Sequence, residues 1–323
     1  MSELLPDFKF ERPQTIEEAL KIFEAGSQSR FCAGGTDLLV NMRRGLVDLE
    51  TLIDLTDISG LKNIDIDQDG LHIGAGVSLR TLSENRQIAL NFDAIAQAAV
   101  SIAGPNHREM ATVGGNLCLD TRCLYLNQSQ WWRKSNDFCL KYKGDICHVA
   151  PKGNRCRAAF SGDLAPALLI YDAQVDLMGP AGSRRIPLKA LYKEDGADHL
   201  SLRTGEILVS IFVPSNQSRS AYEKIRVRGA VDFPLAGVAV SCEDIGDVNY
   251  RFKLAITGTN SMPIMVDVPD FTTGNIDRDA YFEAMGKLIQ KAVSPQRTTT
   301  IAPHYRRLSI AALAVRIAQG LLP

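Results

Sequence analysis

The stretch from Cys123 to Cys156, "CLYLNQSQWWRKSNDFCLKYKGDICHVAPKGNRC", constrains the fold most strongly, because it cannot build a core of its own. It holds four of the seven cysteines and both tryptophans of the chain. Its apolar residues do not recur at helix or strand spacing, so it presents no face to bury. Something other than ordinary core packing must therefore order this segment.

The overall composition narrows the setting in which these cysteines act. The chain has 323 residues, of which 45% are hydrophobic and 23% charged, so we expect two or three ordinary globular domains. Its net charge of −1 does not indicate binding to nucleic acid or to an anionic membrane surface. The sequence shows no secretory signal and no apolar run of membrane-spanning length, so we expect a cytoplasmic protein. In that compartment a cysteine cluster is more typical of a metal or redox site than of disulfides.

Two double-glycine turns are the other unusual feature. The first, Ala33-Gly34-Gly35-Thr36, follows a predicted strand at 30–32 and precedes a helix that begins near Asp37. The second, at 111–116, follows an Ala-rich helix predicted to end at Gly104. Paired glycines let backbone N–H groups come close to a diphosphate, although a Gly-Gly pair is more often a plain tight turn. The chain has neither the Rossmann nor the P-loop pattern, so a nucleotide would have to bind in this other way.

The remaining pattern predicts an α+β chain. Thr15 and Glu18 form a capping box at the start of a helix. Strands are predicted at 49–55, 70–82, 163–179, 206–214, 221–227, 233–244 and 250–260, and helices at 278–293 and 304–321. A polar, turn-prone link follows Pro214. We therefore expect a first region over 1–216 and a C-terminal α+β region over 217–323.

Four motifs, in order, carry a resemblance to a known family. "RFCAGGTDLL", "MATVGGNL", "SGDLAPALLIYDA" and "YEKIRVRGAVDFP" resemble the FAD-binding subunit of the molybdenum hydroxylase (xanthine oxidase) family. The similarity covers essentially the whole chain except the cysteine-bearing stretch. It implies a two-subdomain FAD-binding domain of the PCMH (vanillyl-alcohol-oxidase) type, then a C-terminal α+β domain of the CO dehydrogenase flavoprotein type. It also implies that FAD is held non-covalently.

The resemblance carries the family's FAD contacts over to matching positions. The first diphosphate loop corresponds to Ser29, Arg30, Phe31, Cys32, Ala33, Gly34, Gly35 and Thr36, and the second to Thr112, Val113, Gly114, Gly115 and Asn116. Single contacts are implied at Ile102, Asp163, Leu208 and Lys224. Without the resemblance, Asp163 would be interpreted as a helix N-cap, Leu208 as a core strand residue and Lys224 as a solvated charge. No residue of this chain is implied to be catalytic.

The cysteine-bearing stretch interrupts the family pattern as an insertion at about 119–159. The family's second loop usually reaches its acidic segment within about ten residues, a length typical of compact connections, but here 46 residues lie between Asn116 and Asp163. Cys123, Cys139, Cys147 and Cys156 follow the spacing C-x15-C-x7-C-x8-C. A structural zinc site commonly uses close C-x2–4-C pairs, which these four cysteines do not form among themselves, so their spacing favours a [4Fe–4S] cluster. It leaves zinc, and free or disulfide-bonded cysteines, open.

The charges of the insertion suggest a docking role. Between Arg122 and Arg157, eight basic residues stand against Asp137 and Asp145, a formal charge of +6: Arg122, Arg133, Lys134, Lys141, Lys143, Lys152, Arg155 and Arg157. Such charge would offset a tetrathiolate cluster and steer an acidic donor towards it, and a solvated basic loop is the alternative. Cys32, Cys118 and Cys242 are interpreted as packing residues.

A cysteine-bearing insertion at this place resembles the 4-hydroxybenzoyl-CoA reductase group within the family. That resemblance implies a chain that holds FAD and a [4Fe–4S] cluster and receives electrons from ferredoxin. It implies as partners a molybdopterin-binding α subunit and a γ subunit with [2Fe–2S] clusters, in a dimer of heterotrimers. The overall reaction would be reductive dehydroxylation to benzoyl-CoA. The alternative is the flavin subunit of an oxidising molybdenum hydroxylase whose insertion is a zinc-stapled docking module.

Overall fold

A small parallel sheet opens the chain in the computed structural model, which describes residues 4–229, 231–273, 277–297 and 301–323. The strand order is β1-β3-β2. The elements of this unit are β1 (Lys9–Glu11), α1 (Ile16–Ala25), β2 (Ser29–Cys32), α2 (Leu38–Arg43) and β3 (Thr51–Asp54). The predicted cap of α1 is confirmed, because the Thr15 hydroxyl accepts the Glu18 N–H at 3.1 Å. The first glycine turn leaves the carboxyl end of β2, the edge at which α/β sheets bind ligands.

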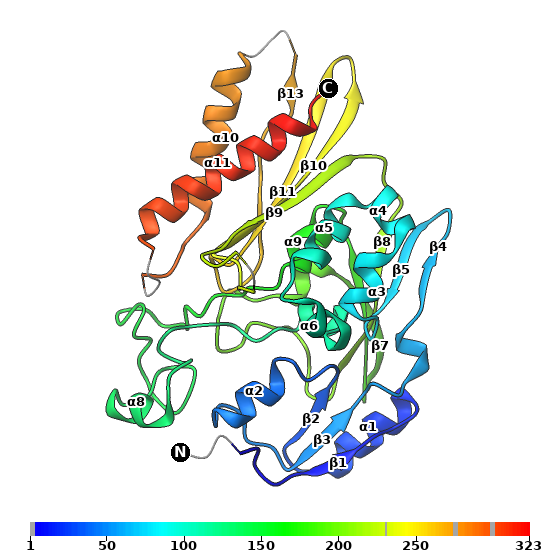
Figure 1. Cartoon of the computed structure of the whole chain (residues 1–323), viewed down its shortest axis with the longest axis vertical. Helices are drawn as coiled ribbons and strands as arrows, with labels where there is room; N and C mark the ends of the chain where they lie inside the picture. Colours follow the sequence, from blue (N-terminus) through cyan, green and yellow to red (C-terminus); the bar gives the residue numbers. More distant parts are fainter. Residues whose placement is uncertain (1–3, 230, 274–276, 298–300) are drawn as a thin grey trace.

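An antiparallel sheet of five strands forms the second layer (Figure 1). Its order is β4-β5-β8-β6-β7, with bounds β4 (Ile64–Ile66), β5 (Gly70–Gly74), β6 (Gln174–Gly179), β7 (Gly182–Pro187) and β8 (Ile207–Pro214). The helices that accompany it are α3 (Leu79–Glu84), α4 (Arg86–Asn91), α5 (Asp93–Ser101), α6 (Pro105–Met110), α7 (Val113–Leu117) and α9 (Leu164–Leu169). Two 3-10 helices are η1 (Ser59–Leu61) and η2 (Leu188–Leu191). Apolar side chains of this sheet and these helices form one large core cluster.

A second antiparallel sheet forms the C-terminal part. Its main order is β12-β11-β10-β9, and β13 pairs with β11. The bounds are β9 (Arg219–Ile225), β10 (Ala236–Gly246), β11 (Asn249–Thr257), β12 (Ile264–Val266), β13 (Phe271–Thr272), α10 (Arg278–Ala292) and α11 (Pro303–Leu321). Val238 and Val240 belong to the cluster with α10 and α11, whereas Ala239 belongs to the cluster with α5 and α9. Alternate residues therefore bury both faces of this sheet.

Three segments differ from the sequence predictions. Residues 164–169 lie in a predicted strand but form α9, whose six residues are all buried. A continuous apolar run of this length does not distinguish a strand from a buried helix. Residues 79–82, predicted as part of a strand and turn, begin α3, and the second glycine turn continues directly into α7. The division into domains at 216 and 217 stays a prediction.

The insertion extends from the body as a long excursion with one short helix, α8 (Gln130–Ser135), seen in green in Figure 1. Within the described residues, positions 120–159 contribute to none of the apolar core clusters. This confirms that ordinary core packing does not order the insertion. Across the ranges described above, no helix is both long and apolar enough to cross a membrane.

Candidate flavin and cysteine sites

The first glycine loop reaches the second through Gly34. A Cβ atom at this position would lie 1.7 Å from the carbonyl oxygen of Met110 and 3.0 Å from the nitrogen of Ala111. Only glycine permits so close an approach. Gly35 has a φ of +68°, in the left-handed region that glycine tolerates. In the described part of the chain, the amides of Gly34 and Thr36 have no protein acceptor, so the loop keeps N–H groups available for an anion.

The second loop differs, because its amides are already engaged. The N–H groups of Val113 and Gly114 donate to the carbonyls of Val77 and Ala75 at 2.9 and 2.8 Å. The Gly115 and Asn116 amides donate to the side chain and carbonyl of Thr112. The anion nest that the sequence predicts at this turn is therefore not formed by these four amides. Gly114 serves packing instead, because a Cβ there would lie 2.8 Å from the Cβ of Ala75.

Asn116 connects the second loop to the acidic segment. Its Oδ1 accepts the backbone N–H of Leu164 at 3.1 Å, in the first turn of α9. Asp163 occupies the N-cap position of α9 but makes no side-chain capping hydrogen bond. Asn116 thus satisfies the helix terminus from a distant part of the chain. The Asp163 carboxylate is released from capping and is free to meet other partners.

Those partners are Tyr222 and Lys224 on β9. The Tyr222 hydroxyl donates to Asp163 Oδ1, and the Lys224 ammonium lies 3.2 Å from the same oxygen. The side chains of Asp163 and Lys224 are only 5% and 4% exposed. Burial raises the pKa of Asp163, while Lys224 and Tyr222 oppose that rise. The structure thus brings together two of the predicted FAD contacts as a buried, hydrogen-bonded ion pair, in place of the cap and the solvated charge.

The other predicted FAD contacts are mainly packing positions in this structure. Ile102, the C-cap of α5, is 8% exposed, and Leu208 lies in β8 with 6% exposure, both in the large core cluster. Phe31 stacks on Phe23 with ring centroids 4.8 Å apart. Burial raises the pKa of Cys32 to about 11, so this thiol is neutral. The place of Leu208 beside a flavin stays a prediction.

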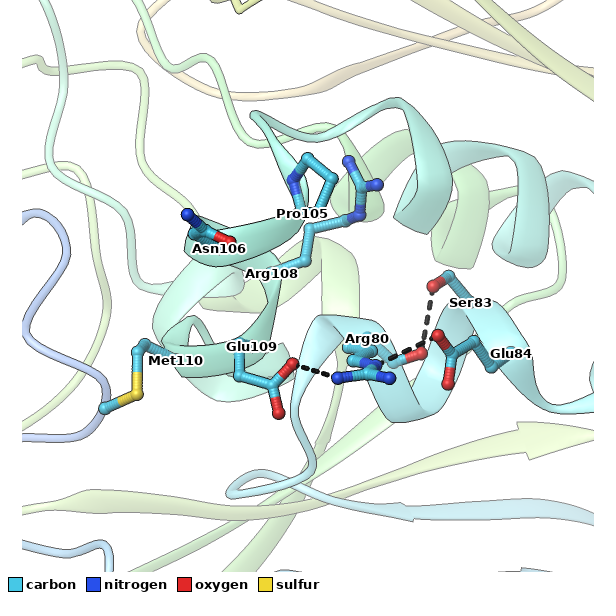
Figure 2. Close-up of a pocket in the computed structure, with 8 residues that line it drawn as sticks. All are labelled: Arg80, Ser83, Glu84, Pro105, Asn106, Arg108, Glu109 and Met110. Atoms are coloured by element: carbon cyan, nitrogen blue, oxygen red, sulfur yellow. Dashed lines mark hydrogen bonds and ion pairs between the residues drawn. The ribbon is translucent and has the colours of Figure 1, made fainter.

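A concave surface between α3 and α6 borders this region (Figure 2). Its charged groups mostly satisfy one another, since Arg80 pairs with Glu84 and with Glu109. Arg108 donates to the carbonyl of Ile102 at 2.8 Å, which ties α6 to the end of α5. None of the predicted FAD contacts lines the surface. This surface is connected to the first glycine loop, because α6 ends at Met110 and Gly34 packs against the Met110 carbonyl.

The four cysteines of the insertion converge on one small cavity. The residues that line it are Cys123, Tyr125, Leu126, Cys139, Leu140, Lys141, Cys147, His148, Val149 and Cys156. Segments up to 33 positions apart in sequence therefore meet around four thiols. No group of three or more His, Cys, Asp and Glu side chains in the described ranges is placed to hold a single metal ion.

Backbone amides point at two of these sulfur atoms. The Ala158 N–H donates to Cys156 Sγ at 3.4 Å, and the amides of Tyr125 and Leu126 lower the pKa of Cys123 by hydrogen bonding. Burial outweighs them and raises the pKa of the Cys123 thiol to about 11. Amides directed at sulfur stabilise thiolates, and hydrogen bonds to the sulfurs tune iron–sulfur centres. Four thiols around one cavity, some with N–H···S contacts, fit the donor set of an all-cysteine cluster.

Several basic residues of the insertion are anchors rather than surface charges. Arg122 pairs with Asp37, next to the first glycine loop, and its guanidinium lies 4.9 Å from the centre of the Phe233 ring. Arg133 is 1% exposed, donates to the carbonyl of Arg44 at 2.8 Å, and stacks on Tyr142. Arg44 is the C-cap of α2, and the helix dipole favours a cation at this end of the helix.

Part of the predicted basic patch remains on the surface. Arg155 pairs with Glu194 at 3.0 Å, and the Lys141 side chain is 10% exposed against Asp120. The exposed charges of the insertion are three lysines and two aspartates: Lys134, Lys143, Lys152, Asp137 and Asp145. Four of the eight basic residues, Arg122, Arg133, Lys141 and Arg155, therefore fix the insertion to its neighbours, and the exposed basic surface is smaller than the charge of +6 suggests.

Comparison with known proteins identifies the family. Residues 6–216 match the family model described as FAD binding domain in molybdopterin dehydrogenase. The chain is 30% identical over 276 residues to the aldehyde oxidoreductase FAD-binding subunit of Escherichia coli K12, covering 81% of this chain and 85% of that protein.

This chain is an FAD-binding subunit of the molybdenum hydroxylase family. It is also 26% identical over 303 residues to a putative xanthine dehydrogenase FAD-binding subunit of the same strain, covering 92% of this chain and 90% of that one. A chain of the Cu,Mo-CO dehydrogenase crystal structure superposes with a TM-score of 0.77 at 22% identity, over 99% and 98% of the two chains. That likeness confirms the predicted fold of an FAD-binding domain followed by a C-terminal α+β domain.

Several residues that connect the sites of this FAD-binding subunit leave little signal in its sequence. Tyr222 precedes Lys224 by two positions on β9, so strand periodicity could have placed it on the same side as Lys224. Asp37 and Arg122 lie 85 positions apart, and no local pattern joins them. Lys141 was included only in a count of charge. Long-range polar contacts of this kind leave no periodic signal.

Proposed function

We propose that this chain is the FAD and [4Fe–4S] electron-transfer subunit of a molybdenum-dependent 4-hydroxybenzoyl-CoA reductase. The observation that carries the proposal is the convergence of Cys123, Cys139, Cys147 and Cys156 on one cavity, in an insertion attached to the flavin fold. A bound [4Fe–4S] cluster supplies low-potential one-electron chemistry, and FAD supplies a relay towards further centres. Ferredoxin is the proposed donor, and reductive dehydroxylation to benzoyl-CoA is the proposed overall reaction.

Different residues of the chain would bind FAD and the cluster. Ser29–Thr36 and Thr112–Asn116 are the proposed diphosphate loops, and the open amides of Gly34 and Thr36 support the first of them. The amides at positions 113–116 are engaged within the protein, so the second loop would contribute through the close packing of its glycines. Ile102, Leu208 and the buried pair of Asp163 with Lys224 are proposed as flavin contacts. The four insertion cysteines would hold the cluster.

Substrate chemistry is assigned to partner subunits. Carbon monoxide dehydrogenase proteins of two bacteria that resemble this chain are named medium chains, which supports a place among subunits of other sizes. We propose a molybdopterin-binding α subunit, a γ subunit with [2Fe–2S] clusters, and a dimer of heterotrimers. The exposed lysines of the insertion, Lys134, Lys143 and Lys152, would assist docking of an acidic donor.

Metal analysis of the intact complex, purified without oxygen, tests the cluster. We expect about four irons and four acid-labile sulfides per copy of this chain beyond those of the partner subunits, and one FAD. Electron paramagnetic resonance of the reduced complex should show a cubane signal that Cys139→Ser removes. One zinc per chain without the additional sulfide would reject the proposal.

The alternative function is the flavin subunit of an oxidising molybdenum hydroxylase with a zinc-stapled docking insertion. The similarity to xanthine dehydrogenase and aldehyde oxidoreductase FAD-binding subunits favours it. Under this alternative, Cys139→Ser leaves flavin reduction by reduced ferredoxin intact, while assembly with the other subunits fails. Under the main proposal, the same substitution slows flavin reduction within an assembled complex.

A further inference from the structure

Lys141 is unusual among the charged residues of the insertion, because it lines the same cavity as the four cysteines. Its side chain is only 10% exposed, whereas Lys143, two positions on, is exposed and lies over the ring of Tyr142. A cation rarely occupies such a buried place without a specific partner. A buried positive charge therefore lies beside four thiols.

The Lys141 ammonium is fixed by oxygen atoms of the neighbouring segment. It lies 2.6 Å from Asp120 Oδ1 and 3.2 Å from the Thr121 carbonyl, and it also donates to the Thr121 hydroxyl. An ammonium has three N–H donors, so these contacts use all of them. Lys141 therefore acts on the cavity through its charge and not as a hydrogen-bond donor to sulfur.

The segment that holds Lys141 is connected to Cys156 by hydrogen bonds. The Thr121 hydroxyl donates to the Gly196 carbonyl at 2.6 Å, and the Gly196 amide donates to the Cys156 carbonyl at 3.0 Å. Asp120 and Thr121 also follow closely after α7, which ends at Leu117. The charge is thus held at a constant place between the cysteine cavity and the segment that follows the second loop.

We propose that Lys141 is a positioning residue that raises the reduction potential of the cluster held by the four cysteines. The inference rests on the proposed function, since it requires that cluster. One-electron reduction adds one negative charge to a cluster, and a fixed cation nearby favours the more negative state. Asp120 acts with the opposite sign, because its carboxylate offsets part of the Lys141 charge.

A purely structural role makes a different prediction. If Lys141 only tied its loop to residues 120 and 121, its loss would reduce cluster content or stability, but the potential of the remaining clusters would not move. Lys141→Arg separates the two roles further, because it keeps the charge but changes the shape of the contact. Lys143→Met is the matched control, since it removes the same charge from the exposed side of the same loop.

The test is a redox titration of the anaerobic complex, followed by electron paramagnetic resonance. The wild type is compared with Lys141→Met, Lys141→Arg, Asp120→Asn and Lys143→Met, and iron and sulfide are measured in each. We expect Lys141→Met to lower the equilibrium constant for one-electron reduction at least tenfold, which is about 59 mV. Asp120→Asn should raise the potential, and Lys141→Arg and Lys143→Met should stay near the wild type.

Two outcomes would overturn the inference, and they are distinguishable from failure of the proposed function. The first is a Lys141→Met complex with full iron and sulfide and an unchanged potential. The second is a shift in Lys143→Met as large as that in Lys141→Met. If Lys141→Met does not retain iron, Asp120→Asn decides, and an unchanged potential there rejects the role. A wild type without the additional iron and sulfide rejects the cluster itself.

Discussion

The flavin fold and the insertion are stabilised by opposite means. In the flavin fold, a continuous apolar core buries entire elements, as in α9, where every residue from Leu164 to Leu169 is buried. The insertion lies outside the core clusters of the described chain, and its most buried large side chain is Arg133. Apolar burial is tolerant of detail, whereas a buried guanidinium depends on particular acceptors. We therefore expect substitutions in the insertion to loosen it while the flavin fold stays intact.

The strongest test of the flavin fold is its buried ion pair. Asp163→Asn leaves the Lys224 ammonium without its carboxylate at 4% exposure. We expect the free energy of unfolding to fall by about 3 kcal/mol, because an unpaired buried charge is costly. Denaturant unfolding of the complex, with its FAD content, measures this. Asp172→Asn is the control, because its pair with Lys253 is exposed, and a loss there as large as at Asp163 would contradict the explanation.

A slightly smaller effect is expected where the two glycine loops meet. Gly34→Ala places a Cβ against the Met110 carbonyl and forces the loops apart. We expect the free energy of unfolding to fall by about 2 kcal/mol, together with a lower ratio of FAD to protein. Gly60→Ala has open space around its Cβ and should change neither quantity. Normal FAD content in Gly34→Ala would mean that the contact between the loops is unnecessary for the flavin.

The insertion should respond separately to loss of its buried arginine. Arg133→Met removes the hydrogen bonds to the carbonyls of Arg44 and Gly45 and the stacking on Tyr142. We expect the free energy of local unfolding of the insertion to fall by about 1.5 kcal/mol, because hydrogen bonds from a charged donor contribute this much. Limited proteolysis should show faster cleavage within 123–156, with retained FAD. Lys134→Met, on the exposed side of α8, should be cleaved as slowly as the wild type.

The smallest effect is expected on the surface of the five-stranded sheet. The Arg185 guanidinium, hydrogen-bonded to Asp176 at 2.7 and 2.9 Å, holds the pKa of that carboxyl below its usual range. The stabilisation is present above the pKa of the unfolded state and is lost as the pH falls through the lower folded value. Thermal unfolding should therefore separate wild type from Asp176→Asn at pH 7 by less than about 1 kcal/mol. The difference should vanish in acid, and a gap that widens in acid would refute this explanation.

The comparison also explains what could be predicted from sequence. The Thr15 cap, β2 and its glycine turn are local features, and each was predicted within a few residues. The family motifs supplied the flavin fold as a whole. In the insertion, only the role of the cysteines could be predicted, because the spacing of thiols is visible in a sequence and the polar contacts that anchor a segment are not. Arg133 and Lys141, counted as surface charge, proved to be buried, since formal charge carries no information about the acceptor that a side chain will find.

Asn116 and Asp163 show the same limit within the flavin fold. A residue before a helix is ordinarily assigned as its cap, which was the local interpretation of Asp163. The capping oxygen instead comes from Asn116, 48 positions before the amide that it accepts. Only the assembled structure shows that this exchange releases a carboxylate for Lys224.

The ion pair between Arg122 and Asp37 has a consequence for the order in which such a subunit matures. Asp37 directly follows the first glycine loop, and Arg122 directly precedes Cys123. Whatever restrains one end of this pair also restrains the other, and the coupling between two binding events is equal in both directions. If the insertion holds the proposed cluster, FAD and the cluster would therefore bind cooperatively, and a subunit lacking one would release the other more readily.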